Sequence, residues 1–262
     1  MMGSTVESIE LTELGIVGDR HWAIRDLERG GIRGAKKIGE LMQFAAARNG
    51  NDAVITFQDG TTVSSADHDV NHMLSAILNH RVMLESLPAD NNLEHFRRGP
   101  SESNDPLTEL RSIFGREENE PLPNFAAFPP EVAEFESPPG THHDCWPLMV
   151  MTTSALQAMQ EALPDSNIDI KRFRPSIVID TDEKGHPEFT WTGKKAQLGT
   201  ATIEFLEPCP RCVMITRRIN DNIPEDRAIL RHVVRDLNQN VGVYARVLKC
   251  GIVNTGDTVQ FV

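Results

Sequence analysis

Cys209 and Cys212 are the residues whose type and spacing most clearly permit chemistry, because only Pro210 and Arg211 separate them. Residues 202–206 (Thr-Ile-Glu-Phe-Leu) precede them and predict a β-strand, so a loop at the strand end would present both thiols to a ligand. A Cys-x-x-Cys pair permits half of a zinc site, a redox-active dithiol, or a single thiolate ligand for a soft transition metal. The spacing alone gives equal weight to two buried, unreactive cysteines.

The zinc and redox interpretations lack their usual partners nearby. A zinc site needs a second ligand pair, for which the sequence offers only residues distant along the chain: His142, His143, Cys145 and Cys250. A redox dithiol of the thioredoxin type opens a helix, whereas residues 213–216 (Val-Met-Ile-Thr) predict a continuing strand. In the single-ligand interpretation, the arginine between the cysteines would stabilise a thiolate and bind an anionic part of a cofactor.

Several segments together resemble the MOSC family, which is named after the C-terminal domain of molybdenum cofactor sulfurases. This family includes the mitochondrial amidoxime-reducing component and its bacterial relatives. The matching segments follow the family's order at 15–20 (Gly-Ile-Val-Gly-Asp-Arg), 140–156, 172–175 (Arg-Phe-Arg-Pro), 189–199, 208–212 (Pro-Cys-Pro-Arg-Cys), 241–244 (Val-Gly-Val-Tyr) and 251–257. Ordered matches of this kind are far more specific than one Cys-x-x-Cys pair.

The resemblance implies that the chain binds a molybdenum cofactor (Mo-molybdopterin), with Cys212 as the metal ligand and the catalytic residue. The residues that it implies for holding the pterin and its phosphate are Arg20, Asp144, Arg174, Ser176, Arg211 and Tyr244. Guanidinium groups bind phosphate through charge-assisted, often bidentate hydrogen bonds, so three such arginines predict an anion pocket. Relatives also supply a lysine from a Pro-Val-Lys-Ser-type segment ahead of the first glycine. The given sequence begins at Met1, roughly where that segment would end, which is consistent with a truncated start, with weaker cofactor binding, or with compensation by Lys36 or Lys37.

Simpler interpretations of the same residues stay open. Arg20 beside Asp19 would form an ordinary ion pair at a turn, and Tyr244 in an apolar strand would be a core phenol. The adjacent residues 142–144 (His-His-Asp) resemble a zinc triad, although neighbours in sequence seldom converge on one ion.

The activity that the resemblance implies is reduction of small N-hydroxylated compounds, such as amidoximes and hydroxylamines, by an oxidoreductase. Electrons would come from a separate donor protein of the ferredoxin, flavoprotein or cytochrome type, for which Arg217 and Arg218 offer a basic docking point. One alternative is a carrier of sulfur, as a persulfide on Cys212, or of the cofactor. The other alternative is a metal-free MOSC interaction module.

Composition limits the other classes of function. The formal net charge of −12 argues against a nucleic-acid partner, because phosphate binding needs a basic face. No apolar stretch approaches the ~20 residues that cross a bilayer, and the start of the chain has no signal-peptide pattern. Four cysteines are too few for a disulfide framework, so we expect a cytoplasmic protein without a membrane partner.

The elements that must position these residues indicate a mostly β protein with a few helices (α+β). Strands are predicted at 21–25, 53–57, 61–63, 81–87, 148–151, 176–179, 202–206, 241–248 and 252–262, and helices at 70–78, after the cap at 152–154, and at 225–239. Eight of the 16 prolines lie between residues 100 and 139. We therefore expect an N-terminal β-rich region (1–95), a proline-rich linker or insertion (96–140) and a MOSC-type β-barrel (141–262).

Overall fold

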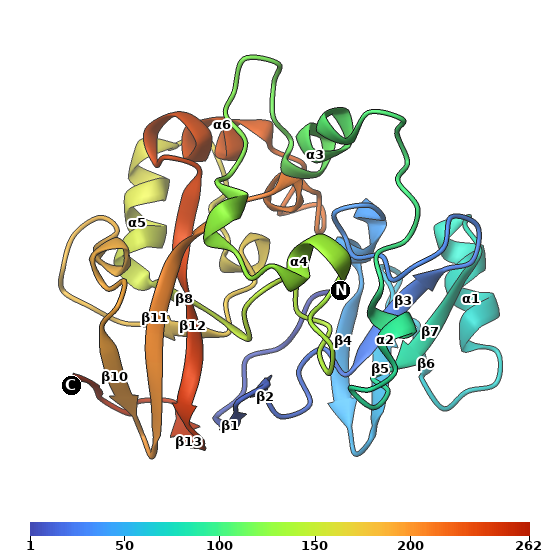
Figure 1. The fold of residues 1–262 in the computed structure, drawn as a ribbon, viewed down its shortest axis with the longest axis horizontal. Coiled ribbons are helices and arrows are strands. Elements are labelled where there is room, and N and C mark those ends of the chain that lie inside the picture. Colours follow the sequence, from blue (N-terminus) through green and yellow to red (C-terminus); the bar gives the residue numbers. More distant parts are fainter. The chain divides into compact units, whose positions relative to one another are not determined.

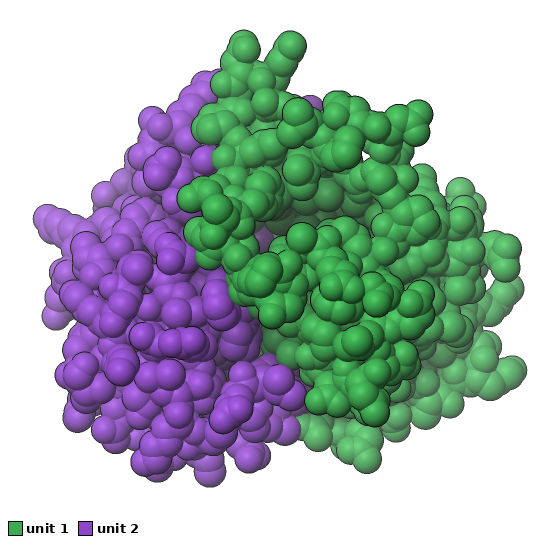
Figure 2. All heavy atoms as spheres, in the orientation of Figure 1, with its two compact units in different colours: residues 1–4, 20–145, 212–224 green, residues 5–19, 146–211, 225–262 purple.

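The computed structural model describes residues 1–262 and divides into two compact units, coloured separately in Figure 2. Unit 1 comprises residues 1–4, 20–145 and 212–224, and unit 2 comprises residues 5–19, 146–211 and 225–262. One of the boundaries between the units along the chain falls at the peptide bond between Arg211 and Cys212. No helix is both long enough and apolar enough to cross a membrane.

Unit 2 is built on a six-stranded sheet that curls into a half-barrel (Figure 1). Its order is β14-β10-β11-β12-β8-β9, and every neighbouring pair is antiparallel except β8 with β9. The strands are β8 (Leu148–Thr152), β9 (Ile177–Ile179), β10 (Lys195–Leu198), β11 (Ala201–Pro210), β12 (Asn240–Lys249) and β14 (Val259–Phe261). A three-stranded sheet joins β1 (Ser8–Thr12) to β2 (Gly15–Ile16) and β13 (Gly251–Asn254). The helices are α5 (Thr153–Ala162) and α6 (Arg227–Asp236), with 3-10 turns η3 (Ile170–Arg172) and η4 (Pro187–Thr190).

The core of unit 2 follows from the alternation of side chains along its two longest strands. On β12, Val243 and Ala245 are fully buried, and on β11 Ile203 and Phe205 meet them on the same face of the sheet. Burial of each large apolar side chain contributes about 1.5–3 kcal/mol. The β12 residues between these core positions, Tyr244 among them, therefore lie on the opposite face.

Gly242 permits the close pairing of β12 with β8. Its φ is +78°, and a Cβ atom there would lie 2.7 Å from the Met149 Sδ and 2.8 Å from the Val150 carbonyl oxygen. Any other residue would therefore have to move the neighbouring strand and would also adopt a strained backbone conformation.

Unit 1 combines small sheets with short helices around a separate core. Strand β3 (Trp22–Asp26) pairs with β7 (Val82–Ser86), and β4 (Ala45–Asn49) pairs with β5 (Asp52–Thr56), which also pairs with β6 (Thr62–Ser64). The helices are α1 (Val70–Leu78), α2 (Leu93–Phe96), α3 (Pro106–Phe114) and α4 (Glu131–Glu134), with 3-10 turns η1 (Gly39–Gln43), η2 (Phe125–Ala127) and η5 (Val213–Thr216).

The segment that follows Cys212 contributes to the core of unit 1. Met214, Ile219 and Ile223 are buried there with the apolar residues of α1, β3, β5 and β7. The predicted strand at 213–216 is wrong, because these residues form the 3-10 turn η5. The Thr216 hydroxyl closes that turn by donating to the Val213 carbonyl oxygen, while Met214 packs into the core. The hydrophobic, β-branched composition of this segment therefore reflects burial rather than strand pairing.

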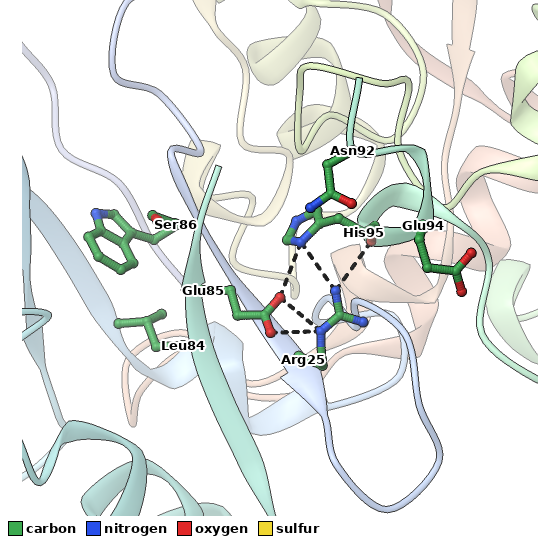
Figure 3. Close-up of a pocket in the computed structure, with 8 residues that line it drawn as sticks. Arg25, Leu84, Glu85, Ser86, Asn92, Glu94 and His95 are labelled. Carbon is green, nitrogen blue, oxygen red and sulfur yellow. Dashed lines mark hydrogen bonds and ion pairs between the residues drawn. The ribbon is translucent and has the colours of Figure 1, made fainter. Parts of the chain in front are cut away.

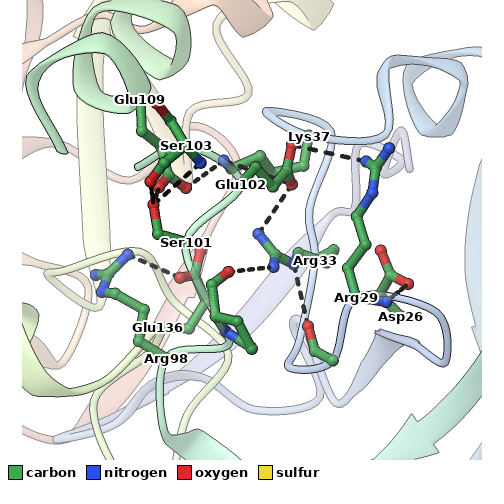
Figure 4. Close-up of polar contacts among 12 residues, drawn as sticks. Asp26, Arg29, Arg33, Lys37, Arg98, Ser101, Glu102, Ser103, Glu109 and Glu136 are labelled. Carbon is green, nitrogen blue, oxygen red and sulfur yellow. Dashed lines mark hydrogen bonds and ion pairs between the residues drawn. The ribbon is translucent and has the colours of Figure 1, made fainter. Parts of the chain in front are cut away.

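A polar network binds the proline-rich segment to the rest of unit 1 (Figure 4). The buried Arg33 donates to the Pro100 carbonyl oxygen at 3.1 Å and to a Glu102 carboxylate oxygen at 3.2 Å. Lys37 donates to Glu109 of α3 at 2.6 Å, and Asp105 caps that helix ahead of Pro106. The segment thus has secondary structure and specific charged contacts.

The predicted fold class, mostly β with a few helices, is confirmed. The predicted division at residues 95 and 140 refers to domain organisation and stays a prediction.

Candidate functional site

The two cysteines of the Cys-Pro-Arg-Cys segment lie in different environments. Cys209, in β11 of unit 2, is only 3% exposed, and its sulfur accepts a hydrogen bond from the Arg211 guanidinium at 3.1 Å. Cys212 lies at the start of η5 in unit 1, is partly exposed and packs against the core of that unit. The more accessible thiol is therefore that of Cys212, which is the predicted metal ligand.

Lys36 is a basic residue of unit 1 that interacts electrostatically with Cys212. Its ammonium group lies 3.0 Å from the Asp144 Oδ1, and its side chain is 18% exposed. Burial disfavours the charged form, but electrostatic interactions with Asp144, Glu136 and Cys212 outweigh this effect and raise the pKa of Lys36. Lys36 therefore stays cationic within electrostatic range of the Cys212 sulfur.

Lys37 makes a separate set of contacts. Its ammonium group pairs with Glu109 at 2.6 Å and lies 3.6 Å from Glu102 in the network of Figure 4. Of the two lysines predicted as replacements for a family lysine, the geometry favours Lys36, because Lys37 anchors the proline-rich segment.

Residues His142, His143 and Asp144 hold the two basic residues Arg20 and Lys36. The His142 Nδ1 lies 3.0 Å from the Arg20 carbonyl oxygen, the His143 Nδ1 lies 3.4 Å from the Arg20 Nη1, and Asp144 pairs with Lys36. The three adjacent side chains therefore point to three different groups. No cluster of three His, Cys, Asp or Glu side chains in the structure has a geometry that would hold a metal ion.

A third histidine, His95, extends this arrangement toward a pocket of about 560 Å³ at β3, β7 and α2 (Figure 3). The His95 Nε2 lies 2.9 Å from the His142 Nε2, and its Nδ1 lies 3.2 Å from the Arg25 Nη2. Arg25 in turn binds both carboxylate oxygens of Glu85 through its Nε at 2.8 Å. Burial lowers the pKa of His142 to about 4, and the neighbouring histidines act in the same direction.

The remaining predicted residues lie in unit 2. Arg211 is buried and donates to the Phe173 carbonyl oxygen at 2.7 Å, which joins the cysteine segment to the Phe-Arg-Pro segment. Arg174 follows Phe173 and has a left-handed backbone with φ of +54°. The Ser176 hydroxyl accepts from the Met149 amide at 3.2 Å, so it belongs to the β8–β9 pairing.

Tyr244 is half-buried on the face of β12 opposite the core residues Val243 and Ala245. Its position therefore differs from that of an ordinary core phenol. Its predicted contact with the cofactor stays a prediction, as do those of Arg174, Ser176 and Arg211.

Two residues important to these arrangements were missed by sequence reasoning. His95 contacts His142 from 47 positions away, and no local pattern marks it. Arg172 is fully buried and donates to the Asn167 carbonyl oxygen at 2.9 Å, although its sequence neighbour Arg174 was the one singled out. Nothing in the sequence around Phe173 indicates that Arg172 is buried.

The predicted docking point for an electron donor is less open than its sequence indicates. The Arg217 guanidinium packs against Gly39. A Cβ atom on Gly39 would lie 3.2 Å from the Arg217 Cζ. Arg218 is half exposed and pairs with Asp221. The role of these arginines in docking stays a prediction.

Comparison with known proteins identifies the C-terminal half of the chain. The family model described as MOSC domain matches residues 139–260. Two similar solved structures are YiiM from Geobacillus stearothermophilus (15% identity, TM-score 0.32) and a structure described as a hypothetical protein (15% identity, TM-score 0.35). Each match covers 45% of this chain and about half of the other chain, 54% for the first and 50% for the second. The comparison with curated proteins gave no match. The chain therefore contains a MOSC domain, at residues 139–260.

Proposed function

We propose that this protein binds a molybdenum cofactor through Cys212 and reduces N-hydroxylated compounds. MOSC domains are associated with this cofactor, which gives the chain a role connected with molybdenum cofactor. The observation that carries the proposal further is the partly exposed Cys212 thiol within electrostatic range of the largely buried Lys36 ammonium group.

The donor set of unit 1 fits the chemistry of the cofactor. A thiolate is a soft ligand suited to a metal whose other ligands include sulfur, and Cys212 is the accessible member of its pair. Lys36 and Arg20 supply positive charge for the anionic pterin phosphate, and Asp144 orients Lys36 through its ion pair. When bound, the cofactor would supply the redox-active metal centre that reduction of the substrate N–O bond requires.

The proposed overall reaction balances with two electrons and two protons. An N-hydroxyl group, R–NH–OH, becomes R–NH₂ and water, so the N–O bond breaks and the nitrogen is reduced. A separate donor protein of the ferredoxin, flavoprotein or cytochrome type supplies the electrons. Cys212 acts as a ligand and forms no bond to the substrate.

The test uses protein produced in a host that makes molybdenum cofactor, with a reduced viologen as artificial electron donor and an aromatic amidoxime as substrate. The proposal expects conversion of the amidoxime to the amidine, in an amount that follows the molybdenum content of each preparation. Protein that contains molybdenum but leaves amidoximes and hydroxylamines unchanged would contradict the proposed reaction while leaving cofactor binding intact.

The second candidate is a sulfur carrier, and the same exposed thiol beside a cation favours it. The Cys212 thiol, which interacts electrostatically with the Lys36 ammonium group, would also hold a persulfide sulfur. Metal-free protein that releases one sulfane sulfur per chain on cyanolysis, and releases none after Cys212→Ala, would support this function in place of the first.

A further inference from the structure

Arg20 has a backbone conformation that its residue type does not favour. Its φ is +49°, in the left-handed region where side chains other than that of glycine incur strain. Such residues persist where the surrounding structure holds them, and they are frequent at functional sites. Contacts that hold Arg20 must therefore be present in unit 1.

His142 makes the contact that holds the main chain of Arg20. A carbonyl oxygen only accepts, so the His142 Nδ1 donates its proton to the Arg20 oxygen at 3.0 Å. Because burial lowers the pKa of His142 to about 4, its ring is neutral at neutral pH and carries no second N–H. The His142 Nε2 is therefore an acceptor.

Because the His142 Nε2 is an acceptor, it determines which ring nitrogen of His95 carries the proton. The two Nε2 atoms lie 2.9 Å apart, so His95 must donate through Nε2, which leaves its Nδ1 to accept from Arg25 at 3.2 Å. The Glu85 carboxylate also lies 3.2 Å from that Nδ1, but burial lowers the pKa of His95 and favours its neutral form. Figure 3 shows that Glu85 contacts both His95 and Arg25, and its contacts with Arg25 are the shorter ones, at 2.8 Å. Arg25 thus donates to His95, His95 donates to His142, and His142 donates to the Arg20 carbonyl oxygen.

His143, the residue after His142, contacts the side chain of Arg20. The His143 Nδ1 lies 3.4 Å from the Arg20 Nη1, so it is placed to accept from the guanidinium. Two consecutive histidines therefore contact the main chain and the side chain of the same arginine, which fixes where its charge points.

From this geometry we infer that His142, supported by His95, is a positioning residue that holds Arg20 in its left-handed conformation and aims its guanidinium. The conformational part of the inference stands on the contacts alone. Its consequence, that the bond from His142 to Arg20 strengthens retention of an anionic cofactor, rests on the proposed function.

Two substitutions separate the bonds that His142 makes. In His142→Asn the amide nitrogen takes the place of Nδ1 and still donates to Arg20, while the contact with His95 is lost. In His142→Gln the amide oxygen takes the place of Nε2 and still accepts from His95, while the bond to Arg20 is lost. The ¹J(Cα–Hα) coupling of labelled Arg20, which differs between positive and negative φ, reports the backbone directly without cofactor.

The inference expects His142→Asn to keep the wild-type coupling and His142→Gln to change it toward a negative φ. In wild-type protein it expects ¹⁵N shifts of a neutral His142 protonated on Nδ1. Protonation on Nε2 instead, or an unchanged coupling in His142→Gln, would overturn the inference even if one of the variants folds poorly.

In holoprotein, we expect His142→Gln to lose molybdenum on dialysis about five-fold faster than His142→Asn, the factor that corresponds to one hydrogen bond. Equal loss from both variants, together with a changed coupling, would overturn the link to cofactor retention. Wild-type protein without molybdenum contradicts the proposed function, and the coupling then still decides the positioning role.

Discussion

The ammonium group of Lys36 lies 3.0 Å from the Asp144 Oδ1, and the two side chains differ sharply in exposure, at 18% for Lys36 and 60% for Asp144. The lysine is therefore held largely inside unit 1 while its counter-ion faces solvent. An exposed carboxylate is a weak partner, since water screens its charge. A ligand phosphate placed at Lys36 would consequently compete with Asp144 at little cost.

Lys36→Met should reduce the molybdenum content of the purified protein about ten-fold, because it removes a charge-assisted bond to an anion at similar side-chain length. Elemental analysis of protein from a cofactor-producing host measures this effect. The matched control is Lys37→Met, which should keep the metal content and instead accelerate hydrogen exchange in α3, where Lys37 binds Glu109. Equal metal content in the two variants would refute the role of Lys36.

A buried carboxylate should make Thr152 important for the stability of unit 2. Glu188 is fully buried and accepts a hydrogen bond from the Thr152 hydroxyl at 2.9 Å, while the same hydroxyl accepts from the Ala155 amide and caps α5. Thr152→Val keeps the side-chain shape but removes these two bonds and a third, which the Thr152 hydroxyl accepts from the Ser154 hydroxyl at 3.1 Å, so the free energy of unfolding should fall by about 2–4 kcal/mol.

Urea unfolding followed by tryptophan fluorescence measures that loss, with Thr153→Val as the control. Thr153 is exposed and its hydroxyl donates to Asp180, so its substitution should cost about 0.5 kcal/mol or less. A similar cost for both substitutions would show that the Glu188 contact contributes nothing.

His142 should make the stability of the protein depend on pH between about 4 and 6.5. Its pKa is lowered from the ordinary value of 6.5 to about 4 on folding, so the unfolded chain binds more protons between these values. The contribution of His142 is therefore fully present above pH 6.5 and declines as the pH falls toward 4. Its size is at most on the order of 3 kcal/mol.

Denaturant titrations at pH 7, 5.5 and 4.5 should show a shallower pH dependence in His142→Asn than in the wild type, because asparagine does not titrate in this range. The residual slope would include His95, whose pKa burial also lowers. Identical slopes in the two proteins would mean that His142 titrates normally in the folded state.

Local patterns predicted the elements whose burial is regular along the chain. The hairpin of β5 and β6 follows from alternating apolar residues around Asp59 and Gly60, and α6 follows from one apolar helical face. Strand β4 was not predicted, because its sequence, Ala-Ala-Ala-Arg-Asn, has no β-prone side chains. It forms a strand through its pairing with β5.

The candidate site was predictable as a set of residues and not as a set of contacts. The cysteine segment and Arg20 stand in recognisable motifs, but the partner of the Arg20 carbonyl is His142, 122 positions away. Choosing Lys36 over Lys37 likewise required the fold, because adjacent lysines in a sequence are chemically equal. Their difference arises from Asp144 on one side and Glu109 on the other.

The central claim is that Cys212 binds molybdenum, and metal stoichiometry after single substitutions tests it most directly. Wild-type protein, Cys212→Ala and Cys209→Ala would be purified from the same cofactor-producing host and analysed for molybdenum and for pterin. We predict about one molybdenum per chain in the wild type, most of it retained in Cys209→Ala, and almost none in Cys212→Ala. Equal molybdenum in all three proteins, or none in the wild type, would contradict the assignment of Cys212 as the metal ligand.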